Sequence, residues 1–78
     1  MTLLFYKRCE NYDSAMEHAY LSLVFIPGAE LINTTNIEKE DGFETEIQTY
    51  SSSDNRIFSV TCEINNDYVD LYIMDLDY

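Results

Sequence analysis

Few residues of this chain combine the types and the spacing that catalysis or metal binding requires. Histidine is the usual general base of catalytic triads, but the chain has one histidine, His18, and no spacing assigns it a partner. Cys9 and Cys62 are more than fifty residues apart, which is not a zinc-ligand spacing. With only Gly28 and Gly42, the chain has no glycine-rich phosphate loop. We expect a protein that is not an enzyme, with no cofactor and no metal, and two reduced thiols in or near its core.

Carboxylates are the abundant reactive group. The chain has 15 Asp and Glu against 4 Lys and Arg, which gives a formal net charge of −11 at pH 7. General acid and base catalysis needs a cleft that shifts carboxylate pKa values, and a domain of 78 residues offers little room for one. A surface of this sign repels nucleic acid and anionic membranes and attracts basic partners. We therefore expect a basic protein partner, and neither direct nucleic-acid binding nor membrane association.

Two other interpretations of this charge are open. Polar residues on strand faces often serve only to keep a protein soluble. Acids at 38, 40 and 41, or at 75 and 77, could bind a hard cation weakly, although no EF-hand loop is present. Ordinary surfaces mix both signs, however, and exposed tyrosines are common in binding surfaces. The composition therefore favours specific binding.

One helix is predicted in the first third of the chain. Ser14-Ala15-Met16-Glu17 follows Asp13 and has the form of a capping box. Apolar side chains then recur at helical spacing, at Met16, Ala19, Tyr20, Leu23 and Val24. The helix should end before Pro27, because the residue preceding a proline is pushed out of the helical region. We expect Tyr20 in the core.

The other elements are predicted to be strands. Apolar and β-branched segments at 3–8, 31–37, 43–48, 58–64 and 68–74 are separated by turn signals, and several alternate with a period of two. Consecutive strands joined by short turns pair antiparallel. We expect a single acidic domain over residues 1–78, an α+β two-layer sandwich of order β-α-β-β-β-β. One helix should pack on a curved antiparallel sheet of four to five strands.

This architecture predicts which residues meet a partner. We expect the helix to cover the face that bears Phe43, Ile47, Phe58, Val60, Val69 and Leu71. Partner-binding residues should lie on the opposite face, in the acidic turn and near the C-terminus, at Glu38, Glu40, Asp41, Glu44, Glu46, Tyr50, Glu63, Tyr68, Asp70, Tyr72, Asp75 and Asp77. Residues two apart on a strand are about 6.7 Å apart, a spacing comparable with that of successive phosphates. A basic groove that neutralises phosphates should therefore accept Glu44 and Glu46.

A short, strongly acidic domain with a tyrosine-bearing acidic face resembles small inhibitors encoded by phages and mobile elements. These include anti-CRISPR and anti-restriction proteins, several of which act as nucleic-acid mimics. The resemblance implies stoichiometric inhibition, in which the protein binds a basic nucleic-acid-binding protein or ribonucleoprotein complex and excludes DNA or RNA. We expect a monomer or a homodimer. No apolar run approaches the eighteen residues that cross a bilayer, and no signal peptide is recognised, so we expect it in the cytoplasm of the host cell.

Two alternatives use the same features. One is an immunity protein or antitoxin that masks a basic nuclease by the same electrostatic attraction. The other is a small assembly subunit whose acidity only keeps it soluble. In that case the first or last strand, as an exposed sheet edge, could pair with another chain.

Overall fold

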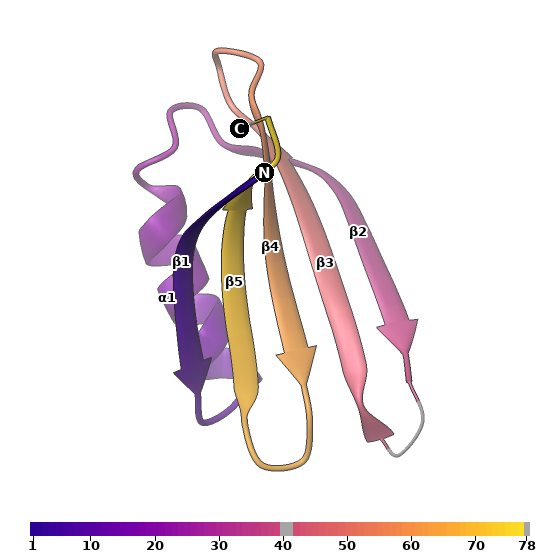
Figure 1. Ribbon diagram of the computed structural model, residues 1–78. Coiled ribbons are helices and arrows are strands. Elements are labelled where there is room, and N and C mark those ends of the chain that lie inside the picture. Colours follow the sequence, from indigo (N-terminus) through magenta and orange to yellow (C-terminus); the bar gives the residue numbers. More distant parts are fainter. Residues whose placement is uncertain (40–41, 78) are drawn as a thin grey trace.

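The observed elements have the predicted types and order. The computed structural model of the protein describes residues 1–39 and 42–77. The elements are β1 (Thr2–Cys9), α1 (Tyr12–Leu23), β2 (Glu30–Glu38), β3 (Glu44–Ser51), β4 (Ile57–Ile64) and β5 (Val69–Asp75). The helix packs against the sheet as a second layer (Figure 1), which confirms the α+β sandwich of order β-α-β-β-β-β.

The five strands form one antiparallel sheet with the spatial order β1-β5-β4-β3-β2. Strands β2 to β5 follow one another as a meander, whereas β1 lies beside β5, so the segment through α1 carries the chain from one edge of the sheet to the other (Figure 1). The edge strands are therefore β1 and β2. The expectation that the last strand could be an exposed edge was wrong, because β5 pairs with β1 on one side and β4 on the other.

The helix begins slightly before the predicted position and uses another cap. Asn11 is the N-cap, and its side-chain oxygen accepts a hydrogen bond from the Ser14 amide at 2.9 Å. The helix ends before Pro27, as predicted. Its buried residues are Ala15, Met16 and Ala19. Tyr20 was expected in the core but is 60% exposed, because the buried stripe runs along the two alanines. Within residues 1–39 and 42–77, no helix has the length and apolarity that crossing a membrane requires.

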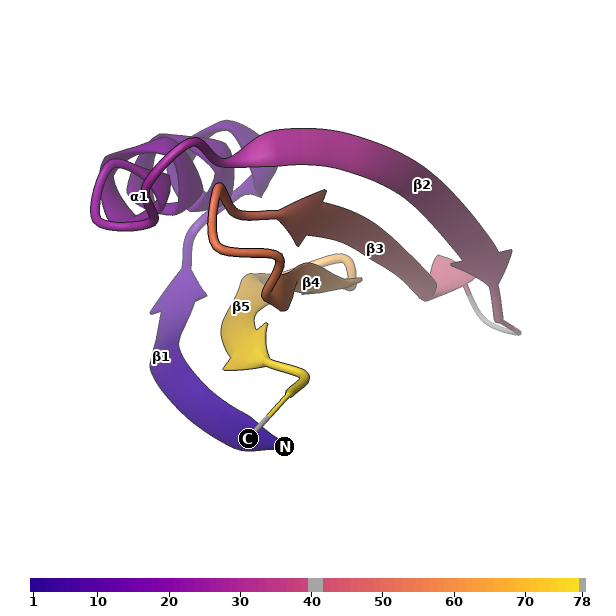
Figure 2. The ribbon, with the colours of Figure 1, turned by 90° about the horizontal axis from the view of Figure 1, so that it is seen from above.

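The helix covers only part of the sheet. It contacts β1, β4 and β5, and Figure 2 shows β2 and β3 continuing beyond it. The core lies under the helix and consists of Cys9, Ala15, Met16, Ala19, Tyr50, Val60, Cys62, Val69, Leu71 and Ile73. Every residue of β2 is exposed. We call the sheet surface on which α1 lies the helix-side face and the other surface the open face.

Strand β3 faces the opposite way from the prediction. Glu46 pairs with the core residue Cys62, and Gln48 pairs with Val60, so Glu44, Glu46 and Gln48 lie on the helix-side face with Tyr50. Ile47 therefore lies on the open face. The prediction assumed that the helix would shield every apolar strand position, but α1 lies mainly over β1, β4 and β5 and reaches β3 through side chains such as Tyr12. The packing of Tyr50 in the core sets the direction of β3 instead. Phe43, also expected under the helix, is 47% exposed.

Candidate partner-binding site

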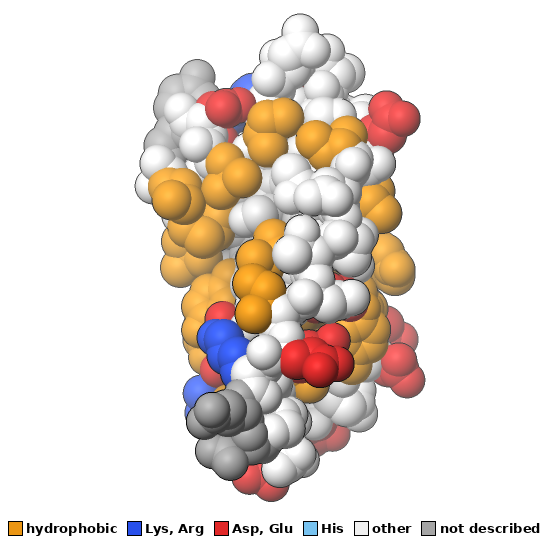
Figure 3. Space-filling view, turned by 90° about the vertical axis from the view of Figure 1, so that its right-hand side faces the viewer, with side chains coloured by type: hydrophobic (Ala, Val, Ile, Leu, Met, Phe, Trp, Pro, Cys, Tyr) orange, Lys and Arg blue, Asp and Glu red, His pale blue; other side chains and the backbone are white. Residues whose placement is uncertain are grey.

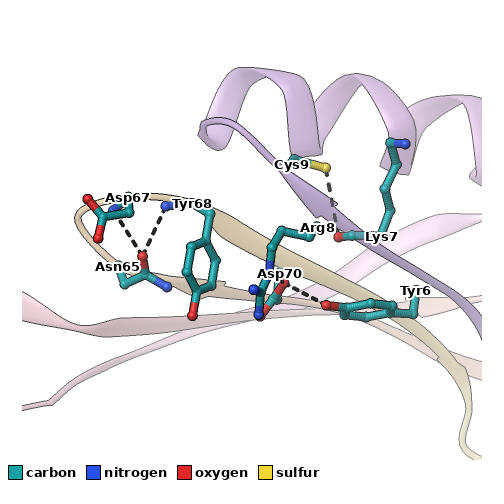
Figure 4. Close-up of polar contacts among 8 residues, drawn as sticks. All are labelled: Tyr6, Lys7, Arg8, Cys9, Asn65, Asp67, Tyr68 and Asp70. Carbon is teal, nitrogen blue, oxygen red and sulfur yellow. Dashed lines mark hydrogen bonds and ion pairs between the residues drawn. The ribbon is translucent and has the colours of Figure 1, made fainter.

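Aromatic and charged side chains of β1, of β5 and of the residue before β5 form a cluster on the open face. Figure 4 shows four of them, Tyr6, Arg8, Tyr68 and Asp70. Arg8 donates to Asp70 through Nε at 2.8 Å and through Nη2 at 3.0 Å, and the Tyr6 hydroxyl donates to Asp70 at 2.8 Å. The Arg8 guanidinium carbon lies 3.7 Å from the ring centroid of Tyr68. The rings of Tyr6 and Tyr72 have centroids 5.0 Å apart. We call these five residues the tyrosine cluster.

The negative charge of Asp70 is compensated by the Arg8 guanidinium inside this cluster. Its residue surface is only 8% exposed, and the hydrogen-bonded Arg8 guanidinium, helped by the Tyr6 hydroxyl, lowers the pKa of the carboxyl. The bond to Asp70 raises the pKa of Tyr6 in turn. A carboxylate with this many internal donors has little capacity left for the basic groups of a partner. Asp70 therefore positions Arg8 and Tyr6, and the tyrosine rings are the groups that the cluster presents.

Three other predicted contact residues also serve the fold. Tyr50 is 7% exposed and belongs to the core. Asp75 is 1% exposed, forms an ion pair with Arg56 and accepts the Asp77 amide at 3.0 Å. The Asp77 carboxylate accepts the Ile57 amide at 2.8 Å. The prediction of Tyr50 and Asp75 as surface groups was wrong, because the register places both on the helix-side face, where Tyr50 packs in the core and Asp75 is buried against Arg56.

Most of the remaining carboxylates lie at one end of the sheet. This end holds the β2–β3 and β4–β5 connections and the start of α1 (Figure 1). We call it the acidic end, and its described carboxylates are Glu10, Asp13, Glu38, Glu44, Glu46, Glu63 and Asp67. Glu40 and Asp41 were predicted to belong to this acidic turn and lie outside the described residues.

Two of these carboxylates face each other. Glu38 on β2 pairs directly with Glu44 on β3, and β-carbons of such a pair are about 5 Å apart. Glu46 follows Glu44 on the same face, two residues along the strand. Glu46 accepts a hydrogen bond from the Tyr12 hydroxyl at 2.7 Å, so its carboxylate is held against the helix. Burial and this bond raise the pKa of Tyr12.

The single acidic and aromatic face that we predicted is divided between two faces. Glu38, Glu44 and Glu46 lie on the helix-side face. Glu63 lies on the open face, where it accepts a hydrogen bond from Thr45 at 2.8 Å and has Lys39 at 3.7 Å. The tyrosine cluster, with the predicted residues Tyr68, Asp70 and Tyr72, shares that open face. Glu63 pairs directly with Asp70, so the tyrosine cluster adjoins the acidic end on the open face.

Sequence reasoning missed Tyr6 and Arg8. They are two residues apart on β1, so they share a face, and Arg8 pairs across the sheet with Asp70 and Tyr6 with Tyr72. Alternation along β1 could have indicated the shared face. The contact with β5 could not be inferred locally, because these residues are more than sixty positions apart in the chain.

The cysteines lie in the core, as predicted. Cys9 and Cys62 are both buried and their thiols are free. Burial, above all, raises the pKa of Cys62 to about 12. A thiol with this pKa is protonated at neutral pH and is a poor nucleophile.

Comparison of the chain with protein families, curated proteins and solved structures finds no match. Among residues 1–39 and 42–77, no group of three or more His, Cys, Asp or Glu side chains is placed to hold a metal ion. The tyrosine cluster and the acidic end are therefore the candidate site, and what they offer chemically is recognition by charge and by aromatic contact.

Proposed function

We propose that this protein is a small cytoplasmic inhibitor that binds a basic nucleic-acid-binding protein or ribonucleoprotein complex and blocks its DNA or RNA site. The acidic end supplies the charge and the neighbouring tyrosine cluster supplies the contact area. The observation that carries the proposal is the facing pair Glu38 and Glu44. Within the described part of the chain, neither carboxylate has an ion-pair partner, since Lys39 lies against Glu63 and Arg8 is bound to Asp70.

This arrangement favours binding over solubility alone. Like charges directly opposite each other on neighbouring strands destabilise a sheet. Acids spread over the surface would keep the protein equally soluble without that cost. A partner that brings Lys or Arg side chains between the two carboxylates would remove the repulsion, so part of the electrostatic cost of folding would be returned on binding.

The geometry also supports mimicry of a nucleic-acid backbone. Glu44 and Glu46 lie two residues apart on one face of β3, where the strand repeat is about 6.7 Å, and Glu38 adds a carboxylate across the strand pair. Basic grooves bind phosphates through Arg and Lys contacts that carboxylates can also make. Tyrosine rings on the open face add contact area with little loss of side-chain entropy. Binding of this kind should weaken steeply with salt.

A pull-down with charge-matched variants tests the proposal. Tagged protein is incubated with nuclease-treated host lysate, and bound proteins are released in salt steps and identified by mass spectrometry. The test variant is E38K/E44K, which reverses the sign of the pair but keeps like charges opposed. The control is E17K/E30K, which has the same net charge but alters two exposed acids outside the acidic end.

We expect wild type and control to retain one basic protein or complex that competing DNA or RNA displaces, and E38K/E44K to lose it. Retention by E38K/E44K at the same salt would contradict the proposed site. If the captured protein is a nuclease whose activity is masked, the immunity or antitoxin interpretation is supported instead.

A second candidate function, assembly, is favoured by the β2 edge. Every residue of β2 is exposed, and the outer edge of the strand has no neighbour in the sheet. Figure 3 looks onto this side and shows hydrophobic side chains among polar ones, with acidic and basic groups between them. Such an edge can pair with a second strand. A sharp dimer in sedimentation that persists at high salt, and that T34P abolishes, would support assembly. A monomer at all salt concentrations would contradict it.

A further inference from the structure

A pocket opens at the end of the molecule opposite the acidic end. It lies between the first residues of β1, the segment that follows α1 and the β3–β4 turn, which share one end of the sheet (Figure 1). Its volume is about 490 Å³, within the range of small-molecule sites. Its apolar walls include Leu4, Phe25, Phe58 and Ile73. We call it the end pocket.

The formal charges of the described residues that line the end pocket add up to a negative value. Asp75 and Arg56 line it as an ion pair, and Asp75 is 1% exposed. Asp54 also lines it and is an exposed residue. The Ser52 hydroxyl donates to Asp54 and lowers its pKa, with a smaller contribution from Arg56, so Asp54 is ionised at neutral pH. Among the described residues that line the pocket, the charged groups are therefore two carboxylates and one guanidinium.

Aromatic rings in the walls of the pocket also favour a positively charged ligand. Phe5, Phe25 and Phe58 all line the pocket, and the faces of such rings attract cations. The Arg56 guanidinium carbon already lies 5.4 Å from the ring centroid of Phe58. Phe25 is 87% exposed, so a large apolar ring is left at the edge of the pocket. A ligand that covers it gains apolar burial as well as charge compensation.

We propose that the end pocket binds a small organic cation, with its ammonium group beside Asp54 and its apolar body between Phe25 and Phe58. A carboxylate ligand would have to approach Asp54 and compete with Asp75 for Arg56. A neutral ligand would bury the same apolar area and leave the charge of Asp54 without a partner. The cation uses both the walls and the charge, and the site is independent of the acidic end.

A titration with three probes of matched length tests which ligand charge the end pocket prefers. The probes are hexylammonium, hexanol and hexanoate, added to ¹⁵N-labelled protein at low ionic strength while amide shifts are followed by NMR. We expect hexylammonium to shift amides around the end pocket and to bind about tenfold more tightly than hexanol, the equivalent of about 1.4 kcal/mol. Hexanoate should bind most weakly. Equal affinity for hexanol, or tighter binding of hexanoate, would overturn the proposal.

Three variants separate the contributions. F25A should weaken binding of all three probes, because it removes a shared apolar wall. D54N should remove the preference for hexylammonium over hexanol and leave hexanol binding unchanged. E10Q is the control, since it removes one exposed charge at the acidic end and should leave the preference intact. If E10Q lowers the preference as much as D54N does, the selectivity comes from overall charge and the proposed site is wrong.

Discussion

The two ends of the molecule place carboxylates in opposite environments. At the end pocket, Asp75 is 1% exposed and is paired with Arg56. At the acidic end, Glu38 is exposed and faces another carboxylate, Glu44. The long axis of the molecule measures 39 Å, several times the Debye length of about 8 Å at physiological salt, so the two ends are electrostatically independent in solution.

This contrast shows why a count of acids is a poor guide to the surface that a partner meets. Asp70 and Asp75 contribute to the formal charge, but each is held by a guanidinium within the chain. The carboxylates of Glu38 and Glu44 carry the same formal charge and remain open to a basic partner. A buried, paired acid should stabilise the fold, whereas an exposed, opposed acid should destabilise it. The two ends can be distinguished by the sign of the effect when a charge is removed.

The largest effect should come from R56A. Loss of the guanidinium leaves Asp75 buried without its ion-pair partner, which typically costs about 3–5 kcal/mol. A domain of 78 residues has an unfolding free energy of about 4–12 kcal/mol by the usual per-residue range. R56A should therefore be marginally folded at pH 7, as measured by urea unfolding.

The double variant R56M/D75L is the control for that result. It replaces both charges by apolar groups, which is often neutral compared with an intact buried pair, so most of the stability should return. A single variant R56A that unfolds within about 1 kcal/mol of wild type would contradict the structural role of this pair.

A smaller effect is expected from D70N at the tyrosine cluster. It removes the charge-assisted bonds from Arg8 and should cost about 1–3 kcal/mol at pH 7. Because the pKa of Asp70 is lowered in the folded state, its contribution is fully present above the unfolded value of about 3.9 and is lost as pH falls through the folded value. The stability difference between wild type and D70N should therefore shrink from pH 5 toward about pH 2. A difference that stays constant over this range would show that packing, and not charge, is lost.

The smallest effect, with the opposite sign, should come from E38Q. Removing one of the opposed charges should stabilise the protein by about 0.2–1 kcal/mol at low ionic strength. The gain should disappear in 1 M salt, where the Debye length is about 3 Å. The matched control is E30Q on the same strand, where Glu30 is exposed and pairs with Ser51. If E30Q stabilises equally, the gain comes from net charge and not from the facing pair.

The predictions from sequence succeeded where the signal is local. Alternation identified β4 and β5, and helical spacing before Pro27 identified α1, because side chains two apart on a strand or four apart on a helix share a face in any fold. The same reasoning failed for β3. Ile47 was assigned to the helix-side face as the more apolar residue, although Tyr50 is the one that packs in the core. Periodicity detects that two faces exist, but it does not show how far a single helix extends over a sheet.

For the candidate site, the amino-acid sequence by itself determined the strong negative charge, the order of the elements and the predicted spacing of Glu44 and Glu46. Only the tertiary structure decided which carboxylates remain accessible to the basic groups of a partner. The pairing of β1 with β5 joins Arg8 to Asp70, and the pairing of β2 with β3 sets Glu38 against Glu44. The end pocket likewise forms from three segments that are distant in the chain. Charge and periodicity are properties of neighbouring residues, whereas burial and ion pairing depend on which strands lie side by side, and that is settled only when the whole chain packs.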